Sequence, residues 1–392
     1  MDISRLKKKF AVIFNRQVDP RVFFAPGRIN LIGEHTDYNG GNVFPAAISF
    51  GTYAVAAKRK DDALRFYSMN FPELGVMECK LSDLDYQESQ AWANYPKGMI
   101  RFLKNEGHSI TTGADILYFG DIPNGAGLSS SASIEMVTGV VMENLYLLEI
   151  DRIRMIQLGQ LVENKYIGVQ SGIMDQFAIG KGKKDHAILL DCKTLAFEYA
   201  PLQLEDYVIV IIHTNKRREL AGSAYNERRL ACERALSDLQ RSLNITTLGE
   251  LTTDQFEQHR YLIDNEVDRK RANHAVYENA RTIKALEVLK ECDLQSFGQL
   301  MNESHQSLKN DYQVTGVELD TIVEAAWQQP GVLGARMTGA GFGGCAIALV
   351  LKGKVDDFKE NVNRIYNDQI GYDATFYLPT ISDGAREIVL KE

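Results

Sequence analysis

The chain is organised around residues 120–136, which read Gly120-Asp121-Ile122-Pro123-Asn124-Gly125-Ala126-Gly127-Leu128-Ser129-Ser130-Ser131-Ala132-Ser133-Ile134-Glu135-Met136. The apolar run before it, residues 114–119, predicts a strand, and apolar residues at helical spacing over 132–147 predict a helix. Glycines let a backbone approach an anion closely, and the unpaired N–H groups of a first helical turn point toward it. Three consecutive serines add hydroxyls suited to phosphate oxygens or to a metal held by them. The stretch predicts a phosphate-binding loop.

The loop alone leaves a second interpretation open, because glycine and serine also suit turns and helix N-caps. It is not a Walker A motif, since no Gly-Lys-Ser/Thr follows the glycines, and it lacks the Gly-x-Gly-x-x-Gly spacing of a Rossmann fingerprint. If the loop binds a nucleotide, it belongs to another class of kinase.

Composition bounds the class of protein. A chain of 392 residues exceeds the usual size of one hydrophobic core, so we expect two domains. The net charge of −8 argues against a nucleic-acid-binding surface. Five scattered cysteines without a C-x-x-C pair fit a reducing cytosol. The N-terminus is not a signal peptide, and the longest apolar runs, such as 208–212, are too short to cross a membrane, so we expect a cytoplasmic protein without a membrane partner.

A second stretch concentrates polar side chains. Residues 25–41 hold Arg28, Glu34, His35 and Asp37 among glycines. Carboxylates accept hydrogen bonds from sugar hydroxyls, and an arginine can bind an anion or stabilise a developing one. We interpret the stretch as a loop whose side chains form several hydrogen bonds to the hydroxyl groups of a polyol. A solvated polar turn with internal ion pairs is the alternative.

The remaining pattern predicts an α+β fold with an antiparallel sheet in the C-terminal part. In the first part we expect a helix over 1–16, a strand over 22–25, antiparallel strands over 43–69 with a turn at Asp61-Asp62, a helix over 95–105, a helix capped by Asp151 and strands over 186–199. In the second we expect a strand over 207–212, a long basic helix over 218–239, mostly helices over 248–328, a strand over 345–351 and a following amphipathic helix. We place a domain boundary near 200–206, dividing the chain into 1–205 and 206–392.

Two further features bear on function. Asp175 is flanked by Ile173, Met174 and Phe177, where an ionised carboxylate is unusual unless it is paired. It either caps a helix start or is a placed base. A second glycine-rich turn occupies residues 339–344.

Residues 26–37, 123–133 and 337–345 together resemble, in order and spacing, the three motifs of the GHMP small-molecule kinases, and the first closely resembles the galactokinase signature. The resemblance covers essentially the whole chain. It implies an N-terminal α+β domain and a C-terminal ferredoxin-like domain, with the active site in the cleft between them and a last strand that can return to the first domain. It also implies transfer of the ATP γ-phosphoryl group to the C1 hydroxyl of α-D-galactose, giving galactose 1-phosphate and ADP, the first committed step of galactose use by the Leloir pathway.

The resemblance further implies roles for single residues. Asp175 matches the base that takes the sugar hydroxyl proton, and Arg28 would hold it ionised and stabilise charge at the reacting oxygens. How directly Asp175 takes the proton stays open, because a loose transition state needs little base assistance. Ser130 and Glu163 match the Mg²⁺ ligands, and oxygen ligands suit this cation. The matching ATP contacts are Ser68, Asn124, Gly125, Ala126, Gly127, Leu128, Ser129 and Ser130. The matching D-galactose contacts are Glu34, His35, Thr36, Asp37, Gly172 and Tyr225.

Two other functions remain open. The first is a catalytically inactive sugar sensor, which the uninterrupted run from Ser129 to Ser133 disfavours. The second is a kinase for N-acetylgalactosamine or another sugar, because room at the sugar C2 position is not visible in a sequence. Nothing in the sequence marks a dimer surface, so we expect a monomer.

Overall fold

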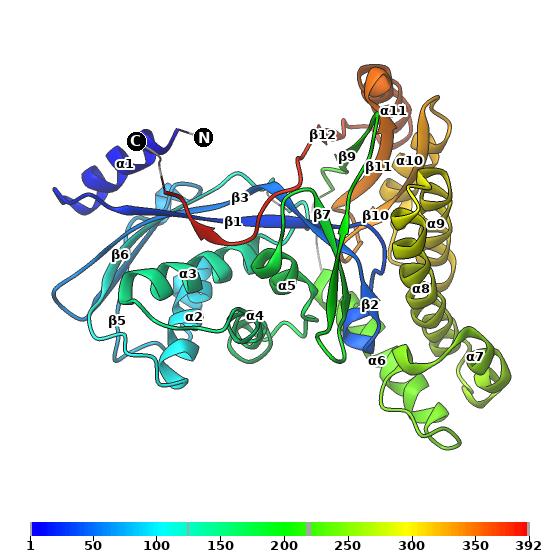
Figure 1. The fold of residues 1–392 in the computed structure, drawn as a ribbon, viewed down its shortest axis with the longest axis horizontal. Coiled ribbons are helices and arrows are strands. Elements are labelled where there is room, and N and C mark those ends of the chain that lie inside the picture. Colours follow the sequence, from blue (N-terminus) through cyan, green and yellow to red (C-terminus); the bar gives the residue numbers. More distant parts are fainter. Residues whose placement is uncertain (1, 124, 217–220, 390–392) are drawn as a thin grey trace.

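Three β-sheets form the scaffold in the computed structural model, which describes residues 2–123, 125–216 and 221–389 (Figure 1). The six-stranded sheet has the order β13 (Arg386–Glu387), β1 (Arg21–Asn30), β3 (Pro45–Lys58), β6 (Ala114–Gly120), β4 (Ala63–Ser68) and β5 (Met77–Lys80). The four-stranded sheet has the order β10 (Val332–Thr338), β11 (Cys345–Leu351), β9 (Tyr207–His213) and β12 (Thr375–Tyr377). The small sheet has the order β2 (Asn42–Val43), β7 (His186–Asp191) and β8 (Phe197–Pro201).

The prediction of a loop that starts at residue 25 is wrong, because strand β1 continues to Asn30. The pairing of β1 with β3 shifts register between Pro26 and Gly27, and pairing resumes beyond this irregularity. Proline lacks the N–H of a ladder bond, and such irregularities are where a strand accommodates it. The consequence for function is that Arg28 stands on a strand, where its backbone is held on one side by β3.

Strands β3 and β4 are formed as predicted around the turn at Asp61-Asp62, but they do not pair with each other. Strand β6 lies between them, antiparallel to β3 and parallel to β4. Alternation of apolar residues reveals a strand but not its neighbour, so the inserted partner was not visible locally.

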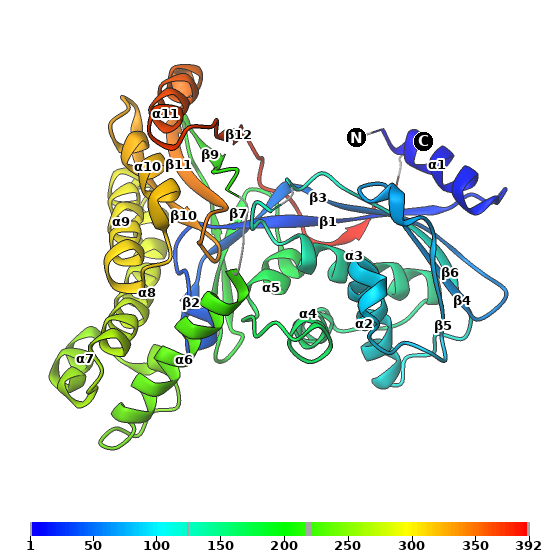
Figure 2. The same ribbon diagram turned by 180° about the vertical axis from the view of Figure 1, so that it is seen from behind.

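Helices cover both faces of the six-stranded sheet (Figures 1 and 2). Those on one face are α2 (Asn94–Asn105), α3 (Ser130–Tyr146), α4 (Arg152–Leu161) and α5 (Met174–Lys181). On the other face α1 (Ile3–Phe14) buries Leu6, Phe10 and Phe14 against strand residues that include Val22 and Val55. Phe23 and Ala54, one position along each strand, face the larger helical layer, as the period of two requires.

The four-stranded sheet is likewise buried on both faces. On β9, Val210 and Ile212 pack against the helical layer, while Ile209 and Ile211 pack into an apolar cluster shared with Ile29 on β1. This shared cluster joins the two halves of the molecule. The helices of this half are α6 (Ala221–Leu239), α7 (Thr253–His259), α8 (Glu266–Lys290), α9 (Leu294–Ser307), α10 (Gly316–Trp327) and α11 (Val355–Ile370).

Most other predicted elements are confirmed, including the antiparallel C-terminal sheet and the Asp151 cap, whose side chain accepts a hydrogen bond from the Arg154 N–H at 2.9 Å. The long basic helix is described from Ala221 onward. At the end of the chain, β13 pairs with β1, beside the first helix in Figure 1. The division at 205/206 stays a prediction. No helix within the described ranges has the length and apolar character needed to cross a membrane.

Candidate active site

The loop between β6 and α3 has the backbone that its glycines predict. Gly125 and Gly127 adopt φ of 70° and 72°, a region that residues with a Cβ rarely enter. Ser129, at φ 65°, adopts the same left-handed conformation directly before α3. The helix therefore begins at Ser130, two residues earlier than predicted, and the N–H groups of its first turn follow directly on the loop. Asn124, a predicted ATP contact, lies outside the described residues.

Arg28 and Asp175 form the central ion pair of the site. Arg28 Nε and Nη2 donate to the two carboxylate oxygens of Asp175, both at 2.9 Å, which is the bidentate geometry of a strong charge-assisted pair. Arg28 Nη1 donates to the Gly127 carbonyl at 2.8 Å. Ser129 Oγ donates to Asp175 Oδ2 at 2.5 Å. Strand β1, the phosphate loop and α5 therefore meet at one carboxylate.

Asp175 does not cap its helix. Ile173 occupies the N-cap position of α5, and Asp175 lies one residue inside the helix, with its side chain turned toward Arg28. Its side chain is 27% exposed, so it is reachable by a ligand. Of the two readings that the sequence allowed, the geometry agrees with a placed carboxylate.

Asp37 and Gly172 meet beside this pair. A Cβ on Gly172 would collide with the Asp37 carboxylate, so a glycine is required for this approach. Burial, and the negative charge of Asp175, raise the pKa of Asp37 to about 6. The ring of Tyr225 lies close to Tyr38, with ring centroids 5.5 Å apart. These groups surround a region beside Asp175 that offers hydrogen-bond acceptors.

The other predicted sugar contacts are already engaged with protein. His35 lies 2.8 Å through Nδ1 from the Tyr38 hydroxyl and 3.2 Å through Nε2 from the Ala340 carbonyl, and burial lowers its pKa to about 3. A neutral ring in this setting donates from Nε2 and accepts at Nδ1. Thr36 is buried, and its hydroxyl is directed to the carbonyls of Gly33 and Asn42, so it shapes the turn. Glu34 is bound to residues of the second glycine turn, described below.

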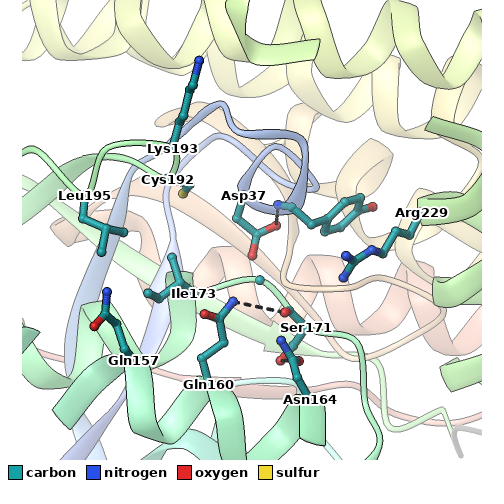
Figure 3. Close-up of a pocket in the computed structure, with 12 residues that line it drawn as sticks. Asp37, Gln157, Gln160, Asn164, Ser171, Ile173, Cys192, Lys193, Leu195 and Arg229 are labelled. Atoms are coloured by element: carbon teal, nitrogen blue, oxygen red, sulfur yellow. Dashed lines mark hydrogen bonds between the residues drawn. The ribbon is translucent and has the colours of Figure 1, made fainter. Parts of the chain in front are cut away.

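A cavity of about 290 Å³ opens beside Asp37 and Gly172 (Figure 3). Figure 3 shows the Asp37 carboxylate directed into it, opposite the side chains of α4. Lining residues that the sequence reasoning missed are Gln157, Gln160, Asn164, Ser171, Ile173, Cys192, Lys193, Leu195 and Arg229. The three amide side chains, Gln157, Gln160 and Asn164, are at positions i, i+3 and i+7 and so lie on one face of a helix. This polar stripe is the sequence pattern from which they could have been predicted.

Glu163 lies on a π-helical turn (Val162–Ile167) after α4. Its carboxylate accepts hydrogen bonds from Ser131 Oγ at 2.7 Å and from Ser171 Oγ. Burial, with a smaller effect of Asp175, raises the pKa of Glu163, so a cation beside it would be stabilising. The described residues contain no cluster of three or more His, Cys, Asp or Glu side chains for a metal. One buried carboxylate with serine hydroxyls fits Mg²⁺ that keeps phosphate and water ligands.

A second cavity of about 230 Å³ contains Ser68, Ser130 and Ser131. It brings two of the predicted ATP-binding residues together, from β4 and from the start of α3. Aromatic residues that the sequence reasoning missed also line it, namely Phe71, Trp92, Tyr95 and Tyr118. Trp92 Nε1 is buried there without a hydrogen-bond partner among the described residues. A planar base with acceptor atoms fits this combination of rings and an available N–H donor.

The second glycine turn faces the first loop. Gly339, at φ 85°, lies so close to the Gly127 carbonyl that a Cβ would be 3.0 Å from it. The Gly339 N–H donates to Glu34 at 2.6 Å, and the Ala340 carbonyl meets His35. The turn therefore packs on both motifs of the first half.

Comparison with known proteins agrees with this geometry. The family model described as "GHMP kinases N terminal domain" matches residues 94–183, and the one described as "GHMP kinases C terminal" matches residues 285–368. Fold and site define a GHMP kinase, a class that uses ATP. The model described as "Galactokinase galactose-binding signature" matches residues 8–58.

The galactokinase of Ligilactobacillus salivarius (strain UCC118) is 58% identical over 386 residues, 98% of this chain and 100% of the relative. That of Exiguobacterium sibiricum is 60% identical over 93% of each chain. The crystal structure of Lactococcus lactis galactokinase complexed with galactose matches with a TM-score of 0.97 and 51% identity, over 98% of this chain and 100% of that one. The chain belongs to the galactokinase family. A mevalonate kinase structure with a TM-score of 0.65 and 21% identity shares the fold.

Proposed function

We propose that this chain transfers the γ-phosphoryl group of ATP to the C1 hydroxyl of α-D-galactose, giving galactose 1-phosphate and ADP. The observation that carries the proposal is the Arg28–Asp175 pair, held against the Gly127 carbonyl of the phosphate loop. Phosphoryl transfer depends mainly on positioning and on neutralising charge, and this pair supplies a cation and a positioned carboxylate beside the phosphate loop.

The reaction forms a bond between the sugar O1 and the γ-phosphorus and breaks the bond from that phosphorus to the bridging oxygen of ADP. Asp175 accepts the proton that O1 gives up. Its Oδ2 accepts from both Arg28 and Ser129, whereas Oδ1 meets only Arg28, so Oδ1 is the oxygen better placed for the sugar hydroxyl. Arg28 pairs with Asp175 before transfer and stabilises negative charge on the reacting oxygens.

The two cavities divide the substrates. D-galactose lies at Asp37, Gly172 and Tyr225, and carboxylate acceptors there match sugar hydroxyl donors. Glu34 and His35 contact the sugar with the hydrogen-bonding capacity that their bonds to the protein do not use. Thr36 stabilises the turn. ATP occupies the cavity of Ser68 and Ser130, and its phosphates follow residues 124–130 to the start of α3.

Magnesium is the proposed metal, and Glu163 with Ser130 would hold it. When bound, Mg²⁺ would neutralise phosphate charge. Ser131, which donates to Glu163, would orient that carboxylate. We further propose that the chain acts in the cytoplasm as a monomer. The five cysteines, all within the described residues, are free thiols, which suits a reducing compartment.

The test is ATP consumption with galactose, glucose, N-acetylgalactosamine and mevalonate, each with and without Mg²⁺. Magnesium-dependent turnover with galactose alone supports the proposal. Turnover with another acceptor would keep the phosphate-binding assignment and overturn the sugar assignment. Galactose binding with no turnover of any acceptor would indicate a sensor.

A further inference from the structure

Arg336 is a fully buried arginine that lies between the two halves of the molecule. It stands on β10 with 0% of its side chain exposed. Its Nη1 lies 2.9 Å from Glu34 Oε2 and donates to the Asn30 carbonyl at 3.1 Å. Its Nε donates to Ser304 Oγ at 3.1 Å. Burying a charged guanidinium group costs free energy, so the position of Arg336 among these partners, between the two halves of the molecule, requires an explanation.

The partner of this arginine, Glu34, is held from three sides. Its side chain is 1% exposed. Oε2 accepts from Asn30 Nδ2 at 2.5 Å as well as from Arg336, while Oε1 accepts from the Gly339 N–H at 2.6 Å. Burial raises the pKa of Glu34, and the charge of Arg336 opposes that effect. The carboxylate is thus the link between residues 30–37 and the second glycine turn.

The same link continues to the phosphate loop. Gly339 stands against the Gly127 carbonyl, which also accepts from Arg28. A parallel contact joins His35 to the Ala340 carbonyl. An ordered chain of contacts therefore runs from Arg336 through Glu34 and Gly339 to Gly127, and from there to the Arg28–Asp175 pair.

A second carboxylate, that of Glu278, also lies near Arg336. Glu278 on α8 lies 3.6 Å from Arg336 Nη2 and accepts from Ser304 Oγ and from the Gly33 N–H. Arg281 keeps Glu278 paired by donating to it at 2.9 Å. Glu278 therefore retains a cation when Arg336 is removed, whereas no other arginine or lysine among the described residues pairs with Glu34.

We propose that Arg336 is a positioning residue that couples galactose binding to nucleotide binding, by holding Glu34 on the Gly339 N–H while that turn rests on the phosphate loop. The inference rests on the proposed function, which places the two ligands on either side of this link. A ligand that orders one loop reduces what the other ligand must order, and this produces a reciprocal gain in affinity.

The experiment is calorimetric titration of galactose into the full-length protein, alone and with saturating Mg²⁺ and a non-hydrolysable ATP analogue. In the unmodified protein the analogue is expected to tighten galactose binding about fivefold or more. In Arg336→Met the ratio of the two affinities is expected to fall below about twofold. Arg336→Lys keeps a cation beside Glu34 and is expected to recover part of the ratio.

Arg336→Met leaves Glu34 buried without its cation, so the fold can be lost. Arg336→Met combined with Glu34→Gln removes both charges and is expected to show the same loss of coupling in a folded protein. Arg16→Met is the matched control, because it removes one of three arginines around the buried Asp115 at the far end of the first sheet. It is expected to lower stability and leave the ratio unchanged.

An unchanged ratio in folded Arg336→Met, or in the folded variant that combines it with Glu34→Gln, overturns the inference, and so does a ratio of one in the unmodified protein that still binds galactose. Absence of galactose binding in both titrations of the unmodified protein would instead overturn the proposed function.

Discussion

Arg28 and Asp175 lie 147 positions apart in the sequence and meet through two hydrogen bonds of 2.9 Å. One residue stands on β1 and the other in the first turn of α5, and the phosphate loop contacts both. The pair places a carboxylate, its counter-ion and the loop backbone at one point.

Replacing Asp175 by asparagine is expected to lower kcat by about 10²–10⁴-fold, because the amide cannot take the sugar proton. Galactose is still expected to raise the thermal unfolding temperature, since most of its contacts remain. Steady-state kinetics and a thermal shift assay measure the two effects. Asp254→Asn, at an exposed position in α7, is the control. A kcat within twofold of the unmodified value would remove Asp175 from the chemistry.

Gly172→Ala is expected to displace the Asp37 carboxylate, because the added Cβ would occupy its place. We expect kcat/KM for galactose to fall by about 10²-fold, while KM for ATP changes little. Gly353→Ala is the matched control, since its Cβ would meet open space. Equal effects on both substrates would show that the alanine disturbs the fold rather than the sugar site.

We expect the contribution of Asp37 to the folding stability of the protein to fall as the pH rises. Its pKa is raised to about 6 from the ordinary 3.8, so the folded protein binds this proton more tightly than the unfolded chain does. The contribution to stability is complete below pH 3.8 and is lost as the pH passes through 6. Asp37→Asn is therefore expected to raise the free energy of unfolding at pH 8 by up to about 3 kcal/mol and to change it little near pH 4.

Urea unfolding at the two pH values measures this difference for Asp37. The same variant is expected to bind galactose more weakly, because an amide offers a single acceptor oxygen to the sugar. A stability gain of equal size at both pH values would show that the carboxylate titrates outside this range.

Glu163→Gln is expected to raise the Mg²⁺ concentration needed for half-maximal activity by about tenfold or more. The loss of negative charge weakens a site that has one carboxylate, whereas galactose affinity without nucleotide is expected to stay the same. Titration of activity with Mg²⁺ after chelation measures the effect. Glu360→Gln, on the exposed side of α11, is the control. An unchanged Mg²⁺ requirement would place the metal elsewhere.

Local chemistry determined much of the molecule. The glycines at 125, 127 and 339 adopt positive φ because the sequence supplies no Cβ there, and the strand and helix around them follow from apolar spacing alone. The three motifs were visible because each is contiguous in the chain. These features depend on interactions within a few residues, and such interactions are readable from the order of amino acids.

The tertiary structure decided which of these groups meet. In the folded protein β6 lies between β3 and β4, and β1 extends far enough to include Arg28. Glu34 pairs with Arg336 and accepts a hydrogen bond from Gly339, a residue 305 positions away in the sequence. The amides of α4 and of the π-helical turn after it line one cavity, and the rings around Trp92 line the other. The physical reason is that burial and pairing across the core join residues whose separation along the chain carries no local signal of contact.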